Sequence, residues 1–101
     1  MDRRLNLQAI LENILGSRNV YFQPPPSIRL SYPCIIYERS TINTMRADNA
    51  AYINRVLYTV TLIGSDPESY FVKDLLKLPM CSYDRFFTSD GLNHDVFSLY
   101  Y

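Results

Sequence analysis

Three consecutive prolines, Pro24 to Pro26, constrain the fold of this chain more than any other feature. Each proline fixes its backbone φ angle and lacks an N–H donor, so this segment is excluded from a helix interior and from a central strand. A short β-like run, Asn19–Gln23, precedes the prolines, and a second one, Ile35–Arg39, follows them. The sequence therefore predicts a loop or edge segment over Pro24–Ser31 that joins two strands.

The length and the charge balance bound the class of protein. With 101 residues and a hydrophobic fraction of 48%, the chain suits a single domain with one core, residues 1–101. Ten basic residues balance ten acidic ones, without the basic stripe that phosphate contacts require, so we expect no specific nucleic-acid partner. No apolar run approaches the roughly 18 residues of a membrane span, and no leader pattern opens the chain. We expect a soluble, unexported protein without a membrane partner.

Two segments carry clear periodic patterns. An apolar stripe with helical spacing, ended by Gly16, predicts a helix over residues 2–15, with Asp2 placed favourably at its positive end. Residues 54–63 alternate as a strand does. The helical stripe consists of Leu7, Ile10, Leu11, Ile14 and Leu15. The strand face expected in the core consists of Val56, Tyr58, Val60 and Leu62, and the half-polar face, solvated or covered by a neighbour, of Leu57, Thr59, Thr61 and Ile63.

A second helix is predicted over residues 66–78. Asp66 can cap it, Pro67 suits the first helical position, and Pro79 stops it. Two strands, 81–88 and 93–101, follow, joined by a turn with an Asp-Gly pair that tolerates positive φ. The order is α-β-β-β-α-β-β, which predicts an α+β domain with a mainly antiparallel sheet and helices packed on one face. The residues expected in its core are Leu11, Ile14, Val60, Leu62, Leu75 and Phe87.

The sequence lacks a pattern of catalytic or metal-binding residues. The single histidine, His94, precedes Asp95, and adjacent strand residues point to opposite faces, so they do not form an acid–base pair. Cys34 and Cys81 stand far apart, which favours two buried free thiols over one disulfide. Asp66 and Glu68 are explained by the helix start, where negative charge is favourable, and the other acidic residues are expected in solvent. We therefore predict no enzymatic activity, no catalytic residue, no metal and no cofactor.

The segment from 38 to 55 is the least core-like. Asn43, Asp48 and Asn49 favour turns, so the segment either extends the flanking strands into a hairpin or forms a mobile loop. It is either an exposed loop or an arm that reaches a neighbouring subunit, because Arg and Tyr are enriched at interfaces. The same two alternatives, sheet packing or interface, apply to the nine tyrosines and five phenylalanines of the chain. The candidate interface residues are Arg39, Arg46, Tyr52, Ile53 and Arg55.

Three stretches carry a family resemblance: Y-F-Q-P-P-P-S-I-R-L-S-Y-P-C-I-I-Y-E, Y-T-V-T-L-I-G-S-D-P-E-S, and L-P-M-C-S-Y-D-R-F-F-T-S-D-G-L-N-H-D-V-F-S-L-Y-Y. Together they resemble the small tail-completion and tail-terminator (neck) proteins of long-tailed bacteriophages. The resemblance implies an α+β subunit of a homo-oligomeric ring, usually a hexamer, which caps the head-proximal end of the tail tube. The partners that it implies are the tail tube protein and the head connector or stopper protein, with DNA passing through the lumen.

The same resemblance implies a structural virion protein, located in the tail or neck and in the host cytoplasm during assembly. Two alternatives stay open at this point. One is a head-closure or connector-ring protein of the neck, which shares the ring but contacts the portal side. The other is a small adaptor that adds a peptide strand to a sheet edge. Self-association distinguishes a ring protein from an adaptor, because the adaptor stays monomeric until it meets its peptide.

Overall fold

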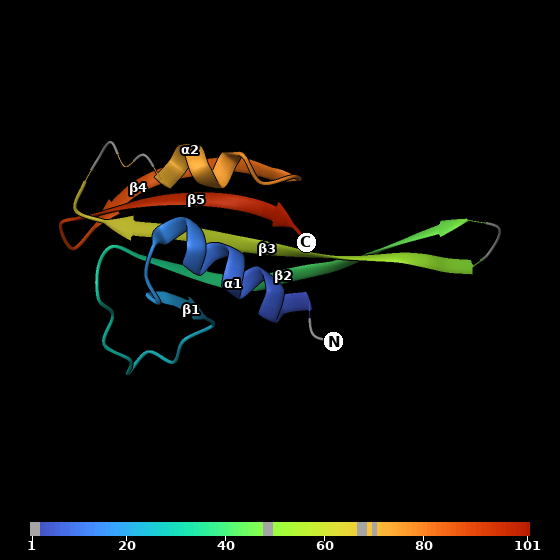
Figure 1. The fold of residues 1–101 in the computed structure, drawn as a ribbon, viewed down its shortest axis with the longest axis horizontal. Coiled ribbons are helices and arrows are strands. Elements are labelled where there is room, and N and C mark those ends of the chain that lie inside the picture. The colour runs from blue at the N-terminus through green and yellow to red at the C-terminus, as the bar shows by residue number, and fades with distance from the viewer. Residues whose placement is uncertain (1–2, 48–49, 67–68, 70) are drawn as a thin grey trace.

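In the computed structural model, a five-stranded sheet carries two helices on the same face (Figure 1). The structure describes residues 3–47, 50–66, 69 and 71–101, and for residues 3, 41–47 and 50–55 it describes the backbone alone. The predicted α+β class and element order are confirmed. The elements are α1 (Arg3–Leu15), β1 (Val20–Phe22), β2 (Cys34–Ala47), β3 (Ala50–Gly64), α2 (Phe71–Leu76), β4 (Cys81–Ser89) and β5 (Leu92–Tyr100).

The position of the proline segment follows from the sheet topology. The strand order is β1-β2-β3-β5-β4, and every neighbouring pair is antiparallel except β1 and β2, which run parallel. A parallel pair needs a connection that carries the chain back along the sheet before the second strand begins. The loop 23–33 is that connection, so the prolines lie where a missing N–H donor costs no ladder hydrogen bond.

The core lies between the two helices and one face of the sheet. Leu7, Leu11 and Leu15 are buried along one side of α1, and Leu75 is buried from α2. Full burial of an aliphatic side chain of this size contributes about 1.5–3 kcal/mol, so this face supplies most of the stability. The strand residues of the same cluster are Val20, Ile35, Tyr37, Tyr58, Val60, Leu62, Phe97 and Leu99.

The buried Tyr37 has hydrogen-bond partners for its hydroxyl. The Tyr37 side chain is fully buried, and its hydroxyl donates a hydrogen bond to Gln8 Oε1 (2.5 Å) and accepts one from Arg4 (3.3 Å). Gln8 Nε2 also donates to the backbone oxygen of Val20 at 2.9 Å, which ties α1 to β1. These contacts remove the penalty of an unpaired buried hydroxyl, about 1–3 kcal/mol.

The expected core was correct for Leu11, Val60, Leu62 and Leu75, all of which are buried, whereas Ile14 is only partly buried against the cluster. The prediction that Phe87 lies in the core was wrong, because this residue is 39% exposed. The reason is a register shift in β4 between Tyr83 and Arg85. Such a bulge adds one residue to the strand, so every later side chain changes face. Phe87 therefore lies on the face that carries no helix.

The helix predicted over 66–78 is shorter in the structure, where α2 spans Phe71–Leu76. At its start, the Ser69 hydroxyl accepts a hydrogen bond from the Phe71 N–H at 3.3 Å. Pro67 and Glu68, which were expected to begin the helix, lie outside the described residues, as does Asp2. The turn of residues 89–92 is confirmed, with φ of 53° at Asp90 and 74° at Gly91.

Among the described residues, no helix is long and apolar enough to cross a membrane.

Candidate functional site

The β2–β3 hairpin extends beyond the rest of the sheet (Figure 1). The two strands pair from Cys34 opposite Ile63 to Ala47 opposite Ala50. β5 pairs with β3 only up to Leu57 opposite Tyr100, and β1 reaches β2 only over residues 35–37. Residues 41–47 and 50–55, which we call the arm, therefore form a two-stranded ribbon with no third strand among the described residues. The molecule accordingly measures 50 × 25 × 22 Å.

Four of the five predicted interface residues lie on the arm. Arg46 lies opposite Ala51 near its tip, Ile53 opposite Met45, and Arg55 opposite Asn43. Tyr52 belongs to the same strand, and the side chains of these four residues lie outside the described part. Arg39 is exposed at the base of the arm, where its N–H donates to Gln23 Oε1 at 3.2 Å. The hairpin alternative for this segment is therefore correct, whereas an intersubunit role stays a prediction.

The other distinctive surface is the outer edge of β4, the last strand of the sheet. Every β4 residue after Cys81 is exposed. The exposed aromatic rings are Tyr83, Phe86 and Phe87, at 43%, 47% and 39%. Asp84 and Arg85 form an ion pair at 2.9 Å beside them, and such an exposed pair contributes little to stability. The edge combines unpaired backbone groups with aromatic surface, which is typical of a strand that accepts a partner.

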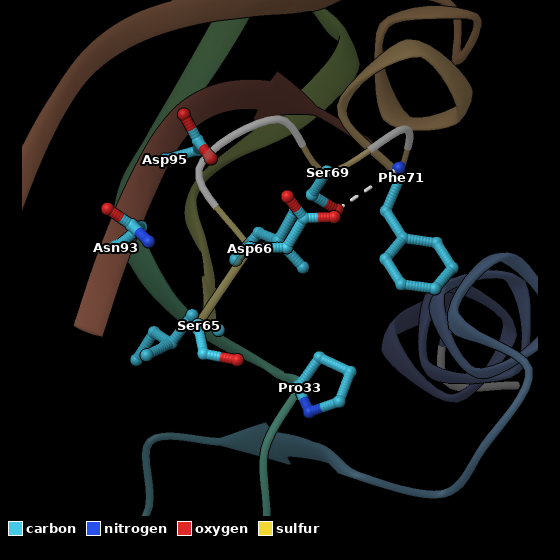
Figure 2. Close-up of a pocket in the computed structure, with 10 residues that line it drawn as sticks. Pro33, Ser65, Asp66, Ser69, Phe71, Asn93 and Asp95 are labelled. Carbon is cyan, nitrogen blue, oxygen red and sulfur yellow. Dashed lines mark hydrogen bonds between the residues drawn. The ribbon is translucent and has the colours of Figure 1, made fainter.

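A cavity of about 190 Å³ opens at the end of the sheet opposite the arm, where β3 ends and β5 begins. Figure 2 shows Asn93 and Asp95 of β5 on one side of this cavity and Pro33 and Phe71 on the other. Ser65, Asp66 and Ser69 complete the polar part of the lining. We call this cavity the acidic pocket, because Asp66 and Asp95 are its only ionisable lining residues among those described.

Among the described residues, Asp95 is the one polar or charged residue that is buried, with 8% of its surface exposed. We expected it in solvent, and that expectation was wrong. Its position alternates with Phe97 and Leu99, so period two places all three on the helix-covered face. The Tyr83 hydroxyl donates to Asp95 Oδ1 at 2.7 Å. Desolvation of that hydroxyl, the hydrogen bond and the negative charge of Asp95 together raise the pKa of Tyr83 to about 12.

His94 and the cysteines lie apart from this pair. As predicted, His94 faces away from Asp95, and its ring stacks on Phe87 with centroids 4.5 Å apart. Cys34 and Cys81 are free, the first fully buried on β2 and the second half-buried on β4. Burial raises the pKa of the Cys34 thiol to about 11 and also raises that of Cys81. A raised thiol pKa disfavours the nucleophilic thiolate.

Within the described residues, no three His, Cys, Asp or Glu side chains come close enough together to hold a metal ion. A second cavity, of about 210 Å³, lies between α1 and the C-terminal strand and is mostly apolar, with Leu7, Leu99 and Tyr101 in its lining. Both cavities are smaller than the roughly 300–1,000 Å³ of small-molecule sites. Their size suits a single side chain from a partner better than a cofactor.

Comparisons with known proteins found no match among protein-family models, curated proteins or solved structures.

Proposed function

We propose that this protein is a structural subunit of a homo-oligomeric ring at the head-proximal end of a bacteriophage tail tube. In this role it ends tail assembly and joins the tail to the head connector, without catalysing a reaction. The observation that carries the proposal is the arm, a ribbon of two strands that extends past the last residues paired with β1 and β5. The choice of a phage tail as the assembly comes from the resemblance of the sequence to tail-terminator proteins.

The arm is a poor structure for an isolated monomer. A two-stranded ribbon is only marginally stable in water, and each of its outer edges presents unpaired backbone groups. A neighbouring subunit can supply both the missing strand partner and the missing packing. In the proposed ring, the arm of one copy would contact a different surface on the next copy, and such a contact is heterologous. Heterologous contacts close into rings when the rotation between subunits permits.

The direct test removes the end of the arm. Residues 43–51 are deleted and the gap is closed with Gly-Ser, and the variant is compared with the wild type by circular dichroism and by sedimentation with purified tail tubes. We expect a folded monomer that neither forms rings nor sediments with tubes, because the deletion spares the core strands. A shortened protein that still assembles and still caps tubes would remove the arm from the interface and leave the proposal without support.

Imaging decides where such a ring resides. Electron microscopy of tails carrying a tagged copy should show density at the upper end of the tail tube. Density on portal-bearing heads that lack tails would instead assign the protein to the head-closure class. Monomers at all concentrations, with no density on either particle, would contradict both.

A peptide-binding adaptor is the second candidate, and the exposed edge of β4 favours it. That strand offers unpaired backbone groups and the rings of Tyr83 and Phe86, which are the elements of strand addition. An adaptor predicts a stable monomer that needs no arm. The deletion above therefore separates the two candidates, since peptide binding at β4 would survive it.

A further inference from the structure

The outer edge of β4 carries Tyr83, Asp84, Arg85 and Phe86 in succession, so an aromatic residue flanks a pair of opposite charges on each side. All four residues are exposed. An antiparallel pairing of this segment with itself sets each acid opposite a base and each tyrosine opposite a phenylalanine. We propose that β4 pairs antiparallel with β4 of a second copy of this chain, about a two-fold axis that passes between Asp84 and Arg85. This contact goes beyond the ring function above, because it uses no residue of the arm.

The first argument is the direction of the backbone groups of β4. The Tyr100 N–H donates to the Met80 carbonyl oxygen at 3.1 Å, while Cys81 lies opposite Leu99. In an antiparallel ladder this pattern means that the N–H and C=O of Cys81 itself point away from β5, toward the edge of the sheet. Backbone direction alternates along a strand together with the side-chain face, so the other β4 residues on the helix-covered face share this direction. They are Tyr83, Phe86 and Thr88, which lie opposite Phe97, Asp95 and Asn93.

The second argument is the register, which depends on the β4 bulge. Asp84 has no partner on β5 and is the extra residue of this bulge. Because of it, Tyr83 and Phe86 lie on the same face of the sheet, although three positions separate them. The proposed pairing sets Tyr83 opposite Phe86, and Cys81 opposite Thr88, of the second copy. Residues with outward-pointing backbone groups therefore face one another, and each facing pair lies on one side of the joint sheet.

The third argument is charge complementarity. Within one copy, Asp84 and Arg85 form an exposed ion pair at 2.9 Å. An edge that carries charges of one sign repels a second copy, which is a common protection of edge strands. An adjacent acid and base do not have this effect, because the two-fold axis sets Asp84 opposite Arg85 twice. The four charges then alternate in sign around the axis, and opposite charges that face each other across strands are favourable.

The Tyr83 ring beside these charges is already held in place. Its hydroxyl donates to Asp95 Oδ1 at 2.7 Å, and the ring meets Phe97 edge-on with centroids 5.3 Å apart. Tyr83 is nevertheless 43% exposed, and Phe86 is 47% exposed. A ring that is fixed beforehand loses little conformational entropy on binding, and aromatic pairs across strands are favourable. Two contacts between Tyr83 and Phe86, one on each side of the axis, form the apolar part of the interface.

The affinity follows from the extent of the contact. One strand of each copy takes part, which places the interface in the small and weak class. We therefore expect monomers in dilute solution and dimers as the concentration rises. The protein that lacks residues 43–51 is accordingly a monomer at the dilution of the tail-tube experiment and pairs through β4 only in concentrated solution.

A cross-link in the full-length protein tests the register. In the proposed pairing, Thr88→Cys places a thiol opposite the native Cys81 of the second copy, with Cα atoms about 5.5 Å apart, a separation that a disulfide spans. Oxidation of a concentrated solution with copper–phenanthroline should convert most of this variant to a covalent dimer on a non-reducing gel. Ser89→Cys is the matched control, because its side chain points to the opposite face. It should give no more dimer than the wild type.

Charge exchange in the Thr88→Cys background tests the electrostatic argument. Asp84→Lys and Arg85→Glu each set like charges against each other, so each should slow cross-linking of dilute protein by roughly tenfold or more. The double variant Asp84→Lys/Arg85→Glu reverses both charges and should restore the original rate. A 1:1 mixture of the two single variants should also cross-link, because each supplies the charge that the other lacks.

Two controls carry the same charge changes at exposed positions outside β4. Glu38→Lys lies on β2 and Arg29→Glu lies in the loop 23–33, and both should cross-link at the original rate in the same background. Circular dichroism and thermal melting identify the variants that fold, and the double variant keeps the test valid where a single variant does not. The proposal is overturned if Thr88→Cys gives no more dimer than Ser89→Cys, or if the folded double variant cross-links as slowly as the single variants.

Deletion of residues 43–51 separates this contact from the ring. The shortened protein with Thr88→Cys should still cross-link in concentrated solution, although we expect it to form no rings. Cross-linking that requires the arm would overturn the pairing of β4 with β4. Tail capping that is lost in the shortened protein while cross-linking persists would support both proposals, because each contact would then act without the other.

Discussion

The two halves of the β2–β3 hairpin are continuous in backbone and opposite in environment. The inner half pairs on both sides, with β1 and β5, and its Tyr37, Val60 and Leu62 lie in the core. The outer half, the arm, pairs only with itself among the described residues. A strand is therefore not a unit of stability by itself, because burial of one face provides most of the free energy. The inner half belongs to the fold, and the role that we propose for the outer half is assembly.

The largest expected effect tests the packing that holds the inner half. Leu75 of α2 is 1% exposed and belongs to the same core cluster as Val60 and Leu62. Leu75→Ala should lower the free energy of unfolding by about 2–5 kcal/mol, a large part of the total for a domain of this size. Denaturant midpoints measure it, with exposed Leu76→Ala as the neighbouring control. A midpoint equal to that of the wild type would show that α2 does not cover the sheet.

A second effect depends on pH and comes from Cys34 at the start of the inner half. Burial raises the pKa of this thiol from 9.0 in the unfolded chain to about 11. The neutral thiol is thus favoured on folding, so the stabilisation is complete below pH 9 and is lost as pH rises toward 11. Two pKa units correspond to roughly 2–3 kcal/mol.

Unfolding free energies measured across that pH window, for the wild type and for Cys34→Ala, isolate the contribution. The variant should show a shallower decline, because its other groups titrate as before. Parallel pH profiles would mean that the thiol is ionised as easily in the folded state as in the unfolded one.

A smaller effect is expected on the helix-free face. His94 stacks on Phe87, and aromatic pairs of this kind contribute about 0.5–1.5 kcal/mol beyond their buried area. His94→Ala should lower stability by about that amount and leave ring formation and tail capping intact, since we assign no chemistry to the imidazole. Cys81→Ala serves as a second variant with the same expectation for assembly. Loss of capping with normal stability in either variant would contradict the proposed absence of catalysis.

The smallest effect on the monomer belongs to the arm. Ile53 pairs with Met45 in the arm, beyond the residues that pair with β1 and β5, so Ile53→Ala should change the free energy of unfolding by less than about 0.5 kcal/mol. Its association should nevertheless weaken if this residue contacts a neighbouring subunit. Thermal melting and sedimentation of the same sample provide both values. A stability loss comparable to that of Leu75→Ala would erase the distinction between the two halves of the hairpin.

Local pattern was sufficient for the element order, for the helix ending at Gly16, and for the core face of β3. These features depend on neighbours in sequence: periodicity of three to four or of two, a glycine with φ of 75°, and prolines that cannot join a ladder. The sequence also contained a pattern that indicates burial of Asp95, since this residue alternates with Phe97 and Leu99. Its charge instead led to the prediction that it is exposed to solvent. The α2 boundary was misplaced, since the helix begins at Phe71, whose N–H bonds to the Ser69 hydroxyl.

The sequence by itself determined the α+β class, the loop at the prolines and most of the core residues, because these depend on the conformational limits of single residues and on short repeats. Only the tertiary structure decided the parallel pairing of β1 with β2, the β4 bulge that turns Phe87 outward, and the position of the acidic pocket opposite the arm. Each of these is set by contacts between segments distant in the chain. Register and burial arise from such contacts, and a local pattern cannot encode which distant strand supplies them.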